Sequence, residues 1–363
     1  MNRLYIATIA MFVVGFAMES RLLLAQGTLD PPTNALVGGV PVATMKTMDQ
    51  VEPRTLISRL PFSIVRPGSY YLASPLDGIP GSNGITIAAS NVRLDLSGFP
   101  LKGTGGSLSG IAVIQASENI VVRNGVVHQW GKYGLDASLA RGVVISDLKA
   151  ITNGWGGLYA GADSLVERCA AYHNGFTGIA TNPPTTDGIQ VGAFSSIIDC
   201  KSGKNKGAGI HTYEHSRILG CTATESLEAN GIWAESYCTI RDCTTARNAN
   251  HGIRVASMCR VTENTSAENG YSGPATNAAG IAVEGSNNLI EKNILAGNDM
   301  GIFVPVTFPF ARGNLIINNA ASKNGIDFRI LDVSNYVGPL EQFMAGNAFT
   351  NTNPWANFRF SGF

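Results

Sequence analysis

Side chains that could carry acid, base and carboxylate chemistry recur at one position of a repeated Gly-Ile phrase in the middle of the chain. His211, Trp233 and Arg254 each stand two residues after the glycine of such a phrase. Tyr213 and Glu235 stand two residues further on in their own phrases. A histidine or a tyrosine can remove the proton beside a carboxylate, and an arginine can neutralise that carboxylate. We therefore predict four catalytic candidates: His211, Tyr213, Arg254 and Glu235.

A second group of residues on the same or neighbouring phrases could hold a sugar. Trp233 could stack on a sugar ring through its apolar face. Tyr159 and Gln190 occupy the position of His211 in the two preceding repeats, and Asp187 stands directly before a phrase glycine. The predicted substrate-binding residues are Trp233, Gln190, Asp187 and Tyr159. The alternative is that this column is ordinary solvated surface, which also contains polar and aromatic side chains.

Two longer connections bracket these phrases and share the pattern Asn-Gly-aromatic-[Ser/Thr]-Gly-x-Ala-Thr-Asn. They lie within residues 175–188 and 270–280. Binding loops commonly stand on a rigid scaffold. We expect these two loops to wall a groove about 15–20 Å long, from three to four coils spaced about 4.8 Å apart, which suits several sugar rings.

The candidates need a scaffold that brings residues of successive repeats side by side. The Gly-Ile or Gly-Leu phrase recurs at intervals of 21 to 31 residues, with its apolar member at Ile85, Ile111, Leu135, Leu158, Ile189, Ile210, Ile232, Ile253, Ile281, Ile302 and Ile326. A second pattern, x-[Ile/Val]-x-x-[Asn/Cys], recurs between the phrases. Self-similarity at such a period indicates a repeat architecture.

Short bursts of alternating apolar residues, punctuated by Asn and Gly, favour strands over helices. No window sustains the i, i+3, i+4, i+7 spacing of an amphipathic helix, and the leucine frame of leucine-rich repeats is missing. We predict an all-β parallel β-helix, a solenoid of about 11 turns with three short strands per turn and a cap at both ends. The recurring asparagines are expected to adopt left-handed backbone at the bends and to hydrogen-bond to one another in stacks.

These units resemble those of a known superfamily. The G-I-x-V units, the x-[Ile/Val]-x-x-Asn units and the Asn columns over about residues 84–328 resemble the right-handed parallel β-helix proteins of the pectate-lyase-like superfamily. The resemblance implies a single-stranded right-handed β-helix. It does not define an activity, because this superfamily includes lyases, hydrolases, epimerases, phage adhesins and copper-handling proteins.

The catalytic motifs of these relatives are incomplete in the chain. Residues 185–191, TTDGIQV, and 250–257, NHGIRVAS, are similar to polygalacturonase motifs. The aspartate pair that glycoside hydrolysis needs is missing, which argues against that activity. YGLDAS keeps Tyr133, Gly134 and Asp136 of the mannuronan-epimerase motif Y-G-x-D-P-H but lacks its Pro-His. Copper-handling relatives would need Met or His clusters, which the sequence does not contain.

The two ends of the chain differ from the repeats. A positive start precedes 14 apolar residues from Leu4, a run too short to span a bilayer. We predict a signal peptide at 1–25, an extended linker at 26–58, the β-helix with its N-terminal cap at 59–328 and a C-terminal capping tail at 329–363. A retained membrane anchor is the alternative. With cleavage the protein is exported (secreted, periplasmic or at the cell surface) and has no transmembrane span.

Six cysteines would suggest disulfides in an exported chain. Their spacing instead places them in two columns, Cys169, Cys200, Cys221 and Cys243 in one and Cys238 and Cys259 in the other. Stacked neighbours hold Cβ atoms about 4.8 Å apart, outside the disulfide range. We predict buried free thiols that act as small apolar residues.

No cofactor or metal is predicted. No C-x-x-C spacing with histidine is present, and Asp136, Asp187 and Glu235, which could bind calcium, form no acidic cluster in the sequence. The 26 basic and 26 acidic residues give no net charge, which argues against a nucleic-acid partner. The remaining histidines stand near predicted turns and are expected to be solvated: His128, His173, His215 and His251.

The sequence thus favours an exported β-helix protein whose partner is a polysaccharide or cell-envelope glycan. A uronate-type glycan would bind in a groove on the first sheet, and the protein would act like a lyase or an epimerase if it is catalytic. The alternative is a non-catalytic cell-surface, structural or adhesin-like β-helix protein.

Overall fold

The computed structural model describes residues 53–176, 185–270, 278–306, 311–344 and 352–361, and the backbone of two short strands nearer the N-terminus. Those two strands, β1 (Leu36–Val37) and β2 (Val40–Pro41), pair antiparallel. The chain divides into one unit at 1–53 and a second at 54–363. The predicted signal peptide and most of both predicted groove loops lie outside the described residues.

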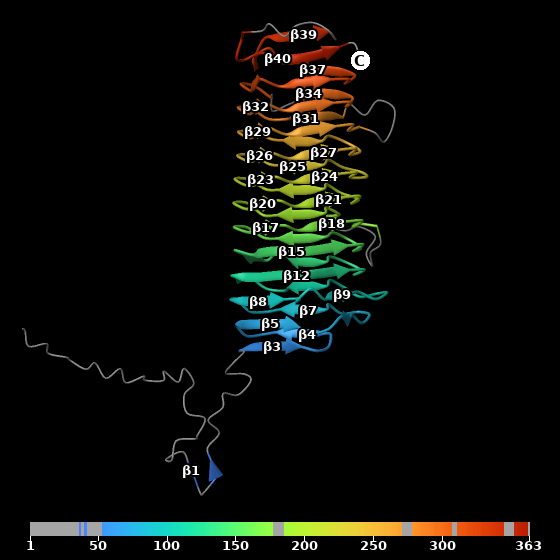
Figure 1. The fold of residues 1–363 in the computed structure, drawn as a ribbon, viewed down its shortest axis with the longest axis vertical. Helices are drawn as coiled ribbons and strands as arrows, with labels where there is room; N and C mark the ends of the chain where they lie inside the picture. Colours follow the sequence, from blue (N-terminus) through green and yellow to red (C-terminus); the bar gives the residue numbers. More distant parts are fainter. Residues whose placement is uncertain are drawn as a thin grey trace, which may run out of the picture. The chain divides into compact units, whose positions relative to one another are not determined.

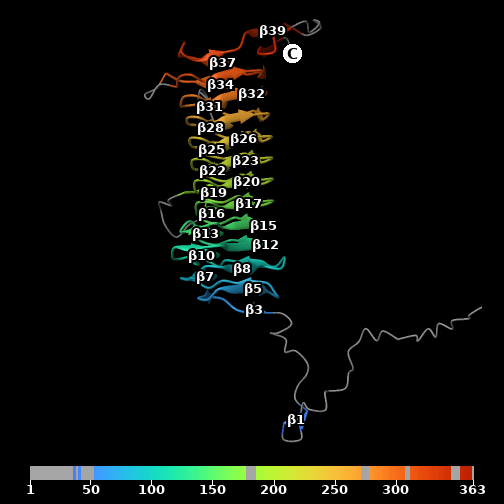
Figure 2. The ribbon, with the colours of Figure 1, turned by 90° about the vertical axis from the view of Figure 1, so that its left-hand side faces the viewer.

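The second unit is a parallel β-solenoid of about 11 turns, and no helix occurs in its described residues. This confirms the predicted fold class. Figures 1 and 2 show its strands stacked along one axis from β3 to β39. Three strand ladders run along the axis because each turn places its strands beside those of the next turn.

Sheet 1 carries the candidate column and has 12 strands, all parallel. In chain order they are β4 (Phe62–Ile64), β7 (Ile85–Ile87), β10 (Ile111–Val113), β13 (Leu135–Ala137), β16 (Leu158–Ala160), β19 (Ile189–Val191), β22 (Ile210–Thr212), β25 (Ile232–Ala234), β28 (Ile253–Val255), β31 (Ala279–Val283), β34 (Met300–Val304) and β37 (Ile326–Ile330).

The second and third ladders share two long strands, β12 (Ile120–His128) and β15 (Val144–Ile151). The second ladder also contains β3 (Arg54–Ile57), β5 (Gly68–Leu72), β8 (Val92–Asp95), β17 (Leu165–Glu167), β20 (Ser196–Ile198), β23 (Arg217–Leu219), β26 (Thr239–Arg241), β29 (Arg260–Thr262), β32 (Leu289–Glu291), β35 (Leu315–Ile317) and β38 (Tyr336–Val337). The third also contains β6 (Leu76–Asp77), β9 (Pro100–Lys102), β18 (Ala170–Tyr172), β21 (Lys201–Gly203), β24 (Thr222–Thr224), β27 (Thr244–Ala246), β30 (Thr265–Ala267), β33 (Ile294–Ala296), β36 (Ala320–Ser322), β39 (Leu340–Met344) and β40 (Asn357–Ser361). A separate pair joins β11 (Ser117–Glu118) to β14 (Ala140–Arg141).

The two ends of the solenoid extend past the predicted limits of the repeats. β3 lies within the range predicted as linker, and it pairs in parallel with β5. At the other end, β39 and β40 lie inside the predicted tail. There β40 pairs with both β39 and β36. The capping role of these end segments stays a prediction.

Aliphatic side chains stack along the interior of the rod. Ile218, Ile240 and Val261 are register partners on β23, β26 and β29, and none of the three is exposed to solvent. Aliphatic side chains stack on aliphatic side chains because the alternation of inward and outward residues along each strand repeats in every turn. The aliphatic members of the x-[Ile/Val]-x-x-[Asn/Cys] pattern therefore face the core in this ladder.

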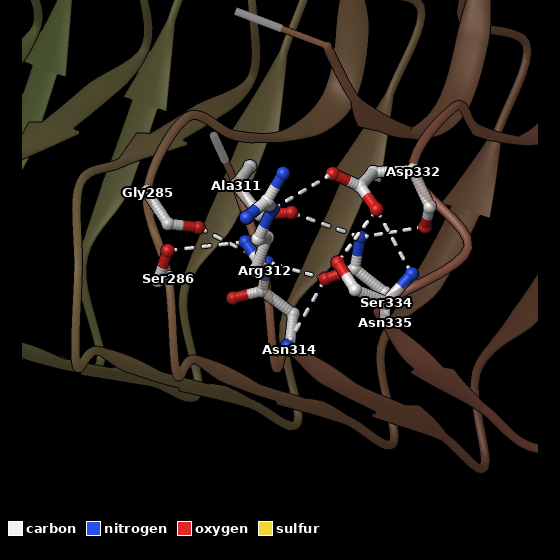
Figure 3. A network of polar contacts seen from close by, with 8 residues as sticks. All are labelled: Gly285, Ser286, Ala311, Arg312, Asn314, Asp332, Ser334 and Asn335. Atoms are coloured by element: carbon white, nitrogen blue, oxygen red, sulfur yellow. Dashed lines mark hydrogen bonds and ion pairs between the residues drawn. The ribbon is translucent and has the colours of Figure 1, made fainter. Parts of the chain in front are cut away.

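Asparagine ladders run beside the aliphatic core. The side-chain amide of Asn153 donates to the side-chain oxygen of Asn174 at 3.0 Å, and Asn174 donates to Asn205 at 2.9 Å. Figure 3 shows another ladder, in which Asn314 donates to Asn335 at 2.8 Å. The predicted side-chain stacks are confirmed, and they pair polar groups that burial would otherwise leave without partners.

The left-handed backbone position was wrongly predicted for these buried ladders. It belongs to the residue before each asparagine, with φ of +57°, +55° and +55° at Thr152, His173 and Lys204. These side chains point away from the core, so the bend tolerates many residue types. The asparagine itself is selected for its amide, which satisfies backbone groups of the neighbouring turns.

All six cysteines are free and buried, as predicted. Their sulfur atoms also accept hydrogen bonds from the backbone, which the sequence did not suggest. The backbone N–H of Cys169 donates to the Cys200 sulfur at 3.4 Å, and the Cys243 N–H donates to the Asn264 side-chain oxygen at 2.9 Å. The cysteine column therefore continues into an asparagine column, and both accept hydrogen bonds from the preceding turn.

Thiol titration should count six free thiols per chain in denaturant without reductant. The expectation follows from the six free cysteines and from the stacking distance, which is too long for a disulfide. Titration with a chromogenic disulfide reagent measures the number directly, and a fully reduced sample provides the control. A count of two or fewer before reduction would contradict the structure.

Candidate functional site

The predicted column is one register row of sheet 1. Gln190 pairs with His211, His211 with Trp233, and Trp233 with Arg254 across β19, β22, β25 and β28. Tyr159 on β16 precedes them in the same row. The structure thus brings together the column residues that the repeat predicted. The row is not evenly exposed, since Gln190 and His211 are only 4% and 6% exposed.

His211 is paired with Asp187, a contact that spacing alone did not predict. The imidazole Nδ1 lies 3.0 Å from the Asp187 carboxylate Oδ2. The other carboxylate oxygen, Oδ1, accepts the backbone N–H of Ala208 at 2.7 Å, which fixes its orientation. A Cβ at Gly207 would come within 2.5 Å of that oxygen, so the glycine makes room for the carboxylate.

The pairing sets the tautomer of His211. A carboxylate only accepts hydrogen bonds, so the imidazole Nδ1 carries a proton, and in the neutral imidazole Nε2 then keeps its lone pair. Asp187 therefore fixes the orientation of the His211 ring, and its predicted role in sugar binding stays a prediction. This is the arrangement in which a carboxylate stabilises the imidazolium that forms after proton transfer.

Trp233 lies between two side chains of neighbouring turns. Its ring stacks on His211 with centroids 4.2 Å apart and planes 5° apart. The Arg254 guanidinium lies over the Trp233 ring, 4.7 Å from its centroid. His211 and Arg254 come from opposite sides, because β25 stands between β22 and β28. Both ring faces are covered, so only the edge of Trp233 is open to a ligand, and face-on sugar stacking does not fit this structure.

Trp233→Ala should lower the free energy of unfolding by about 1–3 kcal/mol, since it removes a stacked ring pair and a cation–π contact. A freely solvated column residue, as the sequence suggested, would instead leave stability unchanged. Urea unfolding of the wild type, Trp233→Ala and Trp233→Phe measures the effect, and Trp233→Phe should lose less because it keeps a ring. Equal stability of all three proteins would contradict the packing of Trp233 between His211 and Arg254.

The remaining two catalytic candidates lie at the C-terminal end of the row. Arg254 forms an ion pair with Glu284, whose side chain is 39% exposed. Glu235 follows β25 and is half-buried. Within the described residues, the contacts of His211 and Arg254 do not include Glu235. The structure therefore connects Arg254 to the cluster through Trp233 and leaves Glu235 beside it.

Tyrosines link His211 to the N-terminal half of the row. Tyr213 stacks on His211 with ring centroids 5.2 Å apart, and its phenol lies close to that of Tyr159. Burial raises the pKa of Tyr159, and Tyr213, Asp136 and Asp187 add to the shift. The Tyr159 phenol is therefore protonated at neutral pH and is a weaker acid than an ordinary tyrosine.

The aromatic cluster extends further than the predicted site. Tyr133 packs edge-on against Tyr159 at 6.1 Å and against Trp155 at 5.5 Å. Burial, and then the Asp136 carboxylate, raise the pKa of Tyr133. A Cβ at Gly156 would lie 3.0 Å from the Tyr133 ring, so that glycine admits the ring. Tyr133 and Asp136 come from the YGLDAS motif, which was the available signal for this extension.

His251 is largely buried, which corrects the expectation that it is solvated. Its Nδ1 accepts the backbone N–H of Ala279 at 2.9 Å. Burial lowers the pKa of His251 to about 4; Glu284 opposes the shift slightly and Arg254 adds to it. The folded protein therefore holds the neutral imidazole.

The free energy of unfolding should fall as the pH drops from about 6.5 to about 4. The unfolded chain protonates His251 at its ordinary pKa of about 6.5, whereas the folded chain does not until about pH 4. The unfolded state thus binds more protons in this window, and the loss is roughly 2–3 kcal/mol. His251→Gln, which keeps an acceptor, should flatten the dependence in urea unfolding at several pH values. Parallel pH profiles for the two proteins would contradict the assignment.

The fold and the candidate site together define the class of protein. The chain is a right-handed parallel β-helix protein with a histidine–aspartate pair in an aromatic row of its first sheet, and residues 83–238 match the family model described as "Right handed beta helix region". Residues 169–357, more than half of the chain, match the model described as "Periplasmic copper-binding protein (NosD)". The chain belongs to the NosD family.

Several solved structures share the fold at low sequence identity. The A-module of Azotobacter vinelandii mannuronan C-5 epimerase AlgE4 is 15% identical over 78% of this chain and 85% of that one, with a TM-score of 0.54. The AlgE6 A-module from the same organism is 13% identical over 85% and 87%, with a TM-score of 0.50. The Dettilon tailspike protein is 16% identical over 85% and 61%, with a TM-score of 0.51. These likenesses show the fold alone. No curated protein matches the chain.

The described residues do not fit the copper that the family description names. Among them, no group of three or more His, Cys, Asp or Glu side chains is placed to hold a metal ion. The thiols of Cys238 and Cys259 donate to the backbone oxygens of Tyr213 and Glu235 inside the core, and the His211 Nδ1 is engaged by Asp187. In the same part of the chain, no helix is long and apolar enough to cross a membrane.

Proposed function

We propose that the protein binds a uronate-type polysaccharide along sheet 1 and acts on it as a lyase or an epimerase, with His211 as the base. The observation that carries the proposal is the pairing of His211 with Asp187 inside a row of aromatic side chains. The fold supports it, since proteins named mannuronan epimerases share this architecture.

The geometry supports a specific proton path. The His211 Nε2, which is buried, takes the proton at C5 of a uronate through one bridging water. The electron pair forms the C4–C5 double bond while the C4–O bond breaks. The Tyr159 phenol, which is protonated at neutral pH, gives its proton to the departing oxygen. In an epimerase, the phenol instead returns a proton to C5 from the opposite face. Tyr213 stacks on His211 and lies close to Tyr159, and it positions the two groups relative to each other.

The carboxylate of the sugar needs a cation, and Arg254 is the candidate. Its partner Glu284 would have to give way, since the two form an ion pair. Trp233 holds Arg254 against the row and offers only its ring edge. Arg254 therefore acts at one end of the proposed site, two turns from His211 with Trp233 between them.

We further propose that the protein is exported and meets a cell-envelope glycan in the periplasm. The family description places its members there, and the predicted signal peptide points the same way. The predicted loops at 175–188 and 270–280 remain our proposal for the walls of the groove.

The second candidate is a non-catalytic glycan-binding or structural role. It is favoured by the engagement of Trp233 on both faces and of Arg254 by Glu284, since both side chains already have partners in the protein.

Incubation with polymannuronate, polyguluronate and polygalacturonate separates the two candidates. A lyase produces ultraviolet absorbance from new double bonds, and an epimerase changes the uronate composition seen by proton NMR. Both signals should vanish in His211→Ala. Binding without either signal would indicate the non-catalytic role, and no binding to any of these polymers would overturn both glycan roles.

A further inference from the structure

A row of exposed aromatic side chains runs along the bend between sheet 1 and the second ladder. Phe194 stacks on His215 with ring centroids 4.8 Å apart and planes 15° apart, and His215 stacks on Tyr237 at 4.5 Å and 7°. Met258 occupies the same position of the next bend. Phe194, Tyr237 and Met258 are 60%, 47% and 46% exposed. We call these four residues the aromatic ridge.

The same bend position carries short polar residues or glycine on the turns before and after the ridge. These residues are Asn91, Asn119, Gly142, Asp163, Asn287 and Gly313. All of them, like the four ridge residues, have left-handed backbone, which Asn, Asp and Gly adopt most readily. Four successive turns instead carry large side chains, three of them aromatic. A contiguous exposed apolar patch of this kind marks an interaction surface.

The charged side chains beside the ridge have no partners in the chain. Glu214 directly precedes His215 on the side of sheet 1. Arg217 begins β23 on the other side, and Arg260 begins β29 two turns further on. All three are exposed, and within the described residues their side chains form no ion pair or hydrogen bond. Other exposed arginines on or beside this ladder are paired, namely Arg123 with Asp95, Arg168 with Asp147 and Arg241 with Asp242.

We propose that the aromatic ridge is a dimer interface, in which two copies of this chain lie parallel about a two-fold axis along the solenoid. Such an axis sets the acidic side of one ridge against the basic side of the other. Glu214 of one copy then faces Arg217 of the partner subunit at the same turn. Each ridge residue faces its own copy, so the apolar side chains form the centre and the charges the rim, as in other protein interfaces.

Charge also decides against the antiparallel arrangement. A two-fold axis perpendicular to the solenoid would set the Glu214 side of one ridge against the same side of the other, and Arg217 and Arg260 against arginines. Like charges that face each other disfavour association. The parallel interface uses one patch on both copies and therefore closes at two chains. This inference does not depend on the proposed glycan function.

Sedimentation equilibrium of the purified protein tests the pairing by charge reversal. The wild type should have the mass of two chains. Arg217→Glu and Glu214→Arg should each dimerise at least about tenfold more weakly, because the two-fold axis repeats the repelling pair. An equal mixture of the two variants should regain the wild-type affinity, because in a mixed dimer every charge meets its opposite. Arg241→Glu, on the next outward row of the same ladder, should dimerise like the wild type.

Two results would overturn the proposal. One is a wild type that stays monomeric at every concentration that can be reached. The other is a dimer whose affinity neither charge reversal changes, since that dimer would use another surface. Circular dichroism melts show whether both variants fold, so loss of association is not confused with unfolding.

Crosslinking tests the parallel arrangement separately. Asn287→Cys places a thiol at the exposed position that follows Met258 in the row and leaves the ridge intact. In the parallel dimer the two new thiols face each other, whereas an antiparallel dimer would separate them by about five turns, roughly 24 Å. A short bifunctional maleimide should therefore join two Asn287→Cys chains. The six native cysteines are buried, and Thr244→Cys, exposed on the third ladder, is the control. Crosslinking of Asn287→Cys no faster than of Thr244→Cys would contradict the parallel dimer.

Discussion

Ile240→Asp should unfold the solenoid at temperatures where the wild type is folded. Ile240 is fully buried on β26 between Ile218 and Val261 of the neighbouring turns. A carboxylate there has no partner, and burying it costs several kcal/mol. Each turn of a solenoid is stabilised mainly by its two neighbours, so a defect in a central turn weakens both interfaces.

Thr239→Asp provides the matched control, since Thr239 is the adjacent residue and points outward between Arg217 and Arg260 on the neighbouring strands. It should melt within a few degrees of the wild type, because a surface substitution changes stability by about 0.5 kcal/mol or less. Circular dichroism melts measure all three proteins. If the two variants melt alike, the burial pattern of this ladder is wrong.

Asp187→Asn should reduce kcat on the preferred uronate polymer by about 100- to 10,000-fold, on the premise that His211 is the base. An asparagine keeps the shape, and its oxygen can still accept the Ala208 N–H. Its amide then faces Nδ1 and donates to it, which moves the imidazole proton to Nε2. The lone pair that removes the C5 proton is lost, while the fold is retained.

The control for this variant is Asp242→Asn, an exposed carboxylate beside Arg241 after β26. It removes the same charge without touching the row and should keep wild-type turnover. Initial rates of double-bond formation or epimerisation measure both variants, and thermal melts confirm folding. Asp187→Asn at the wild-type rate would show that His211 does not depend on its carboxylate and would remove the basis of the proposed proton path.

The repeat alone predicted one part of the candidate site and missed another. The row of Gln190, His211, Trp233 and Arg254 followed from equal offsets behind successive glycines, because parallel strands of similar turns stack in register. The contact between Asp187 and His211 did not follow, because it joins a bend of one turn to a strand of the next. Such a contact depends on side-chain rotamers and on the space left by Gly207.

The sequence by itself determined the repeat, the fold class and the free cysteine columns. It could do so because the same stacking constraint acts on every turn, so the same residue types recur at the same position of many repeats. Only the tertiary structure decided that Trp233 is sandwiched, that His211 and Gln190 are buried, and that left-handed backbone precedes the ladder asparagines. These features depend on what each side chain meets on the turn above and below, and that differs from turn to turn.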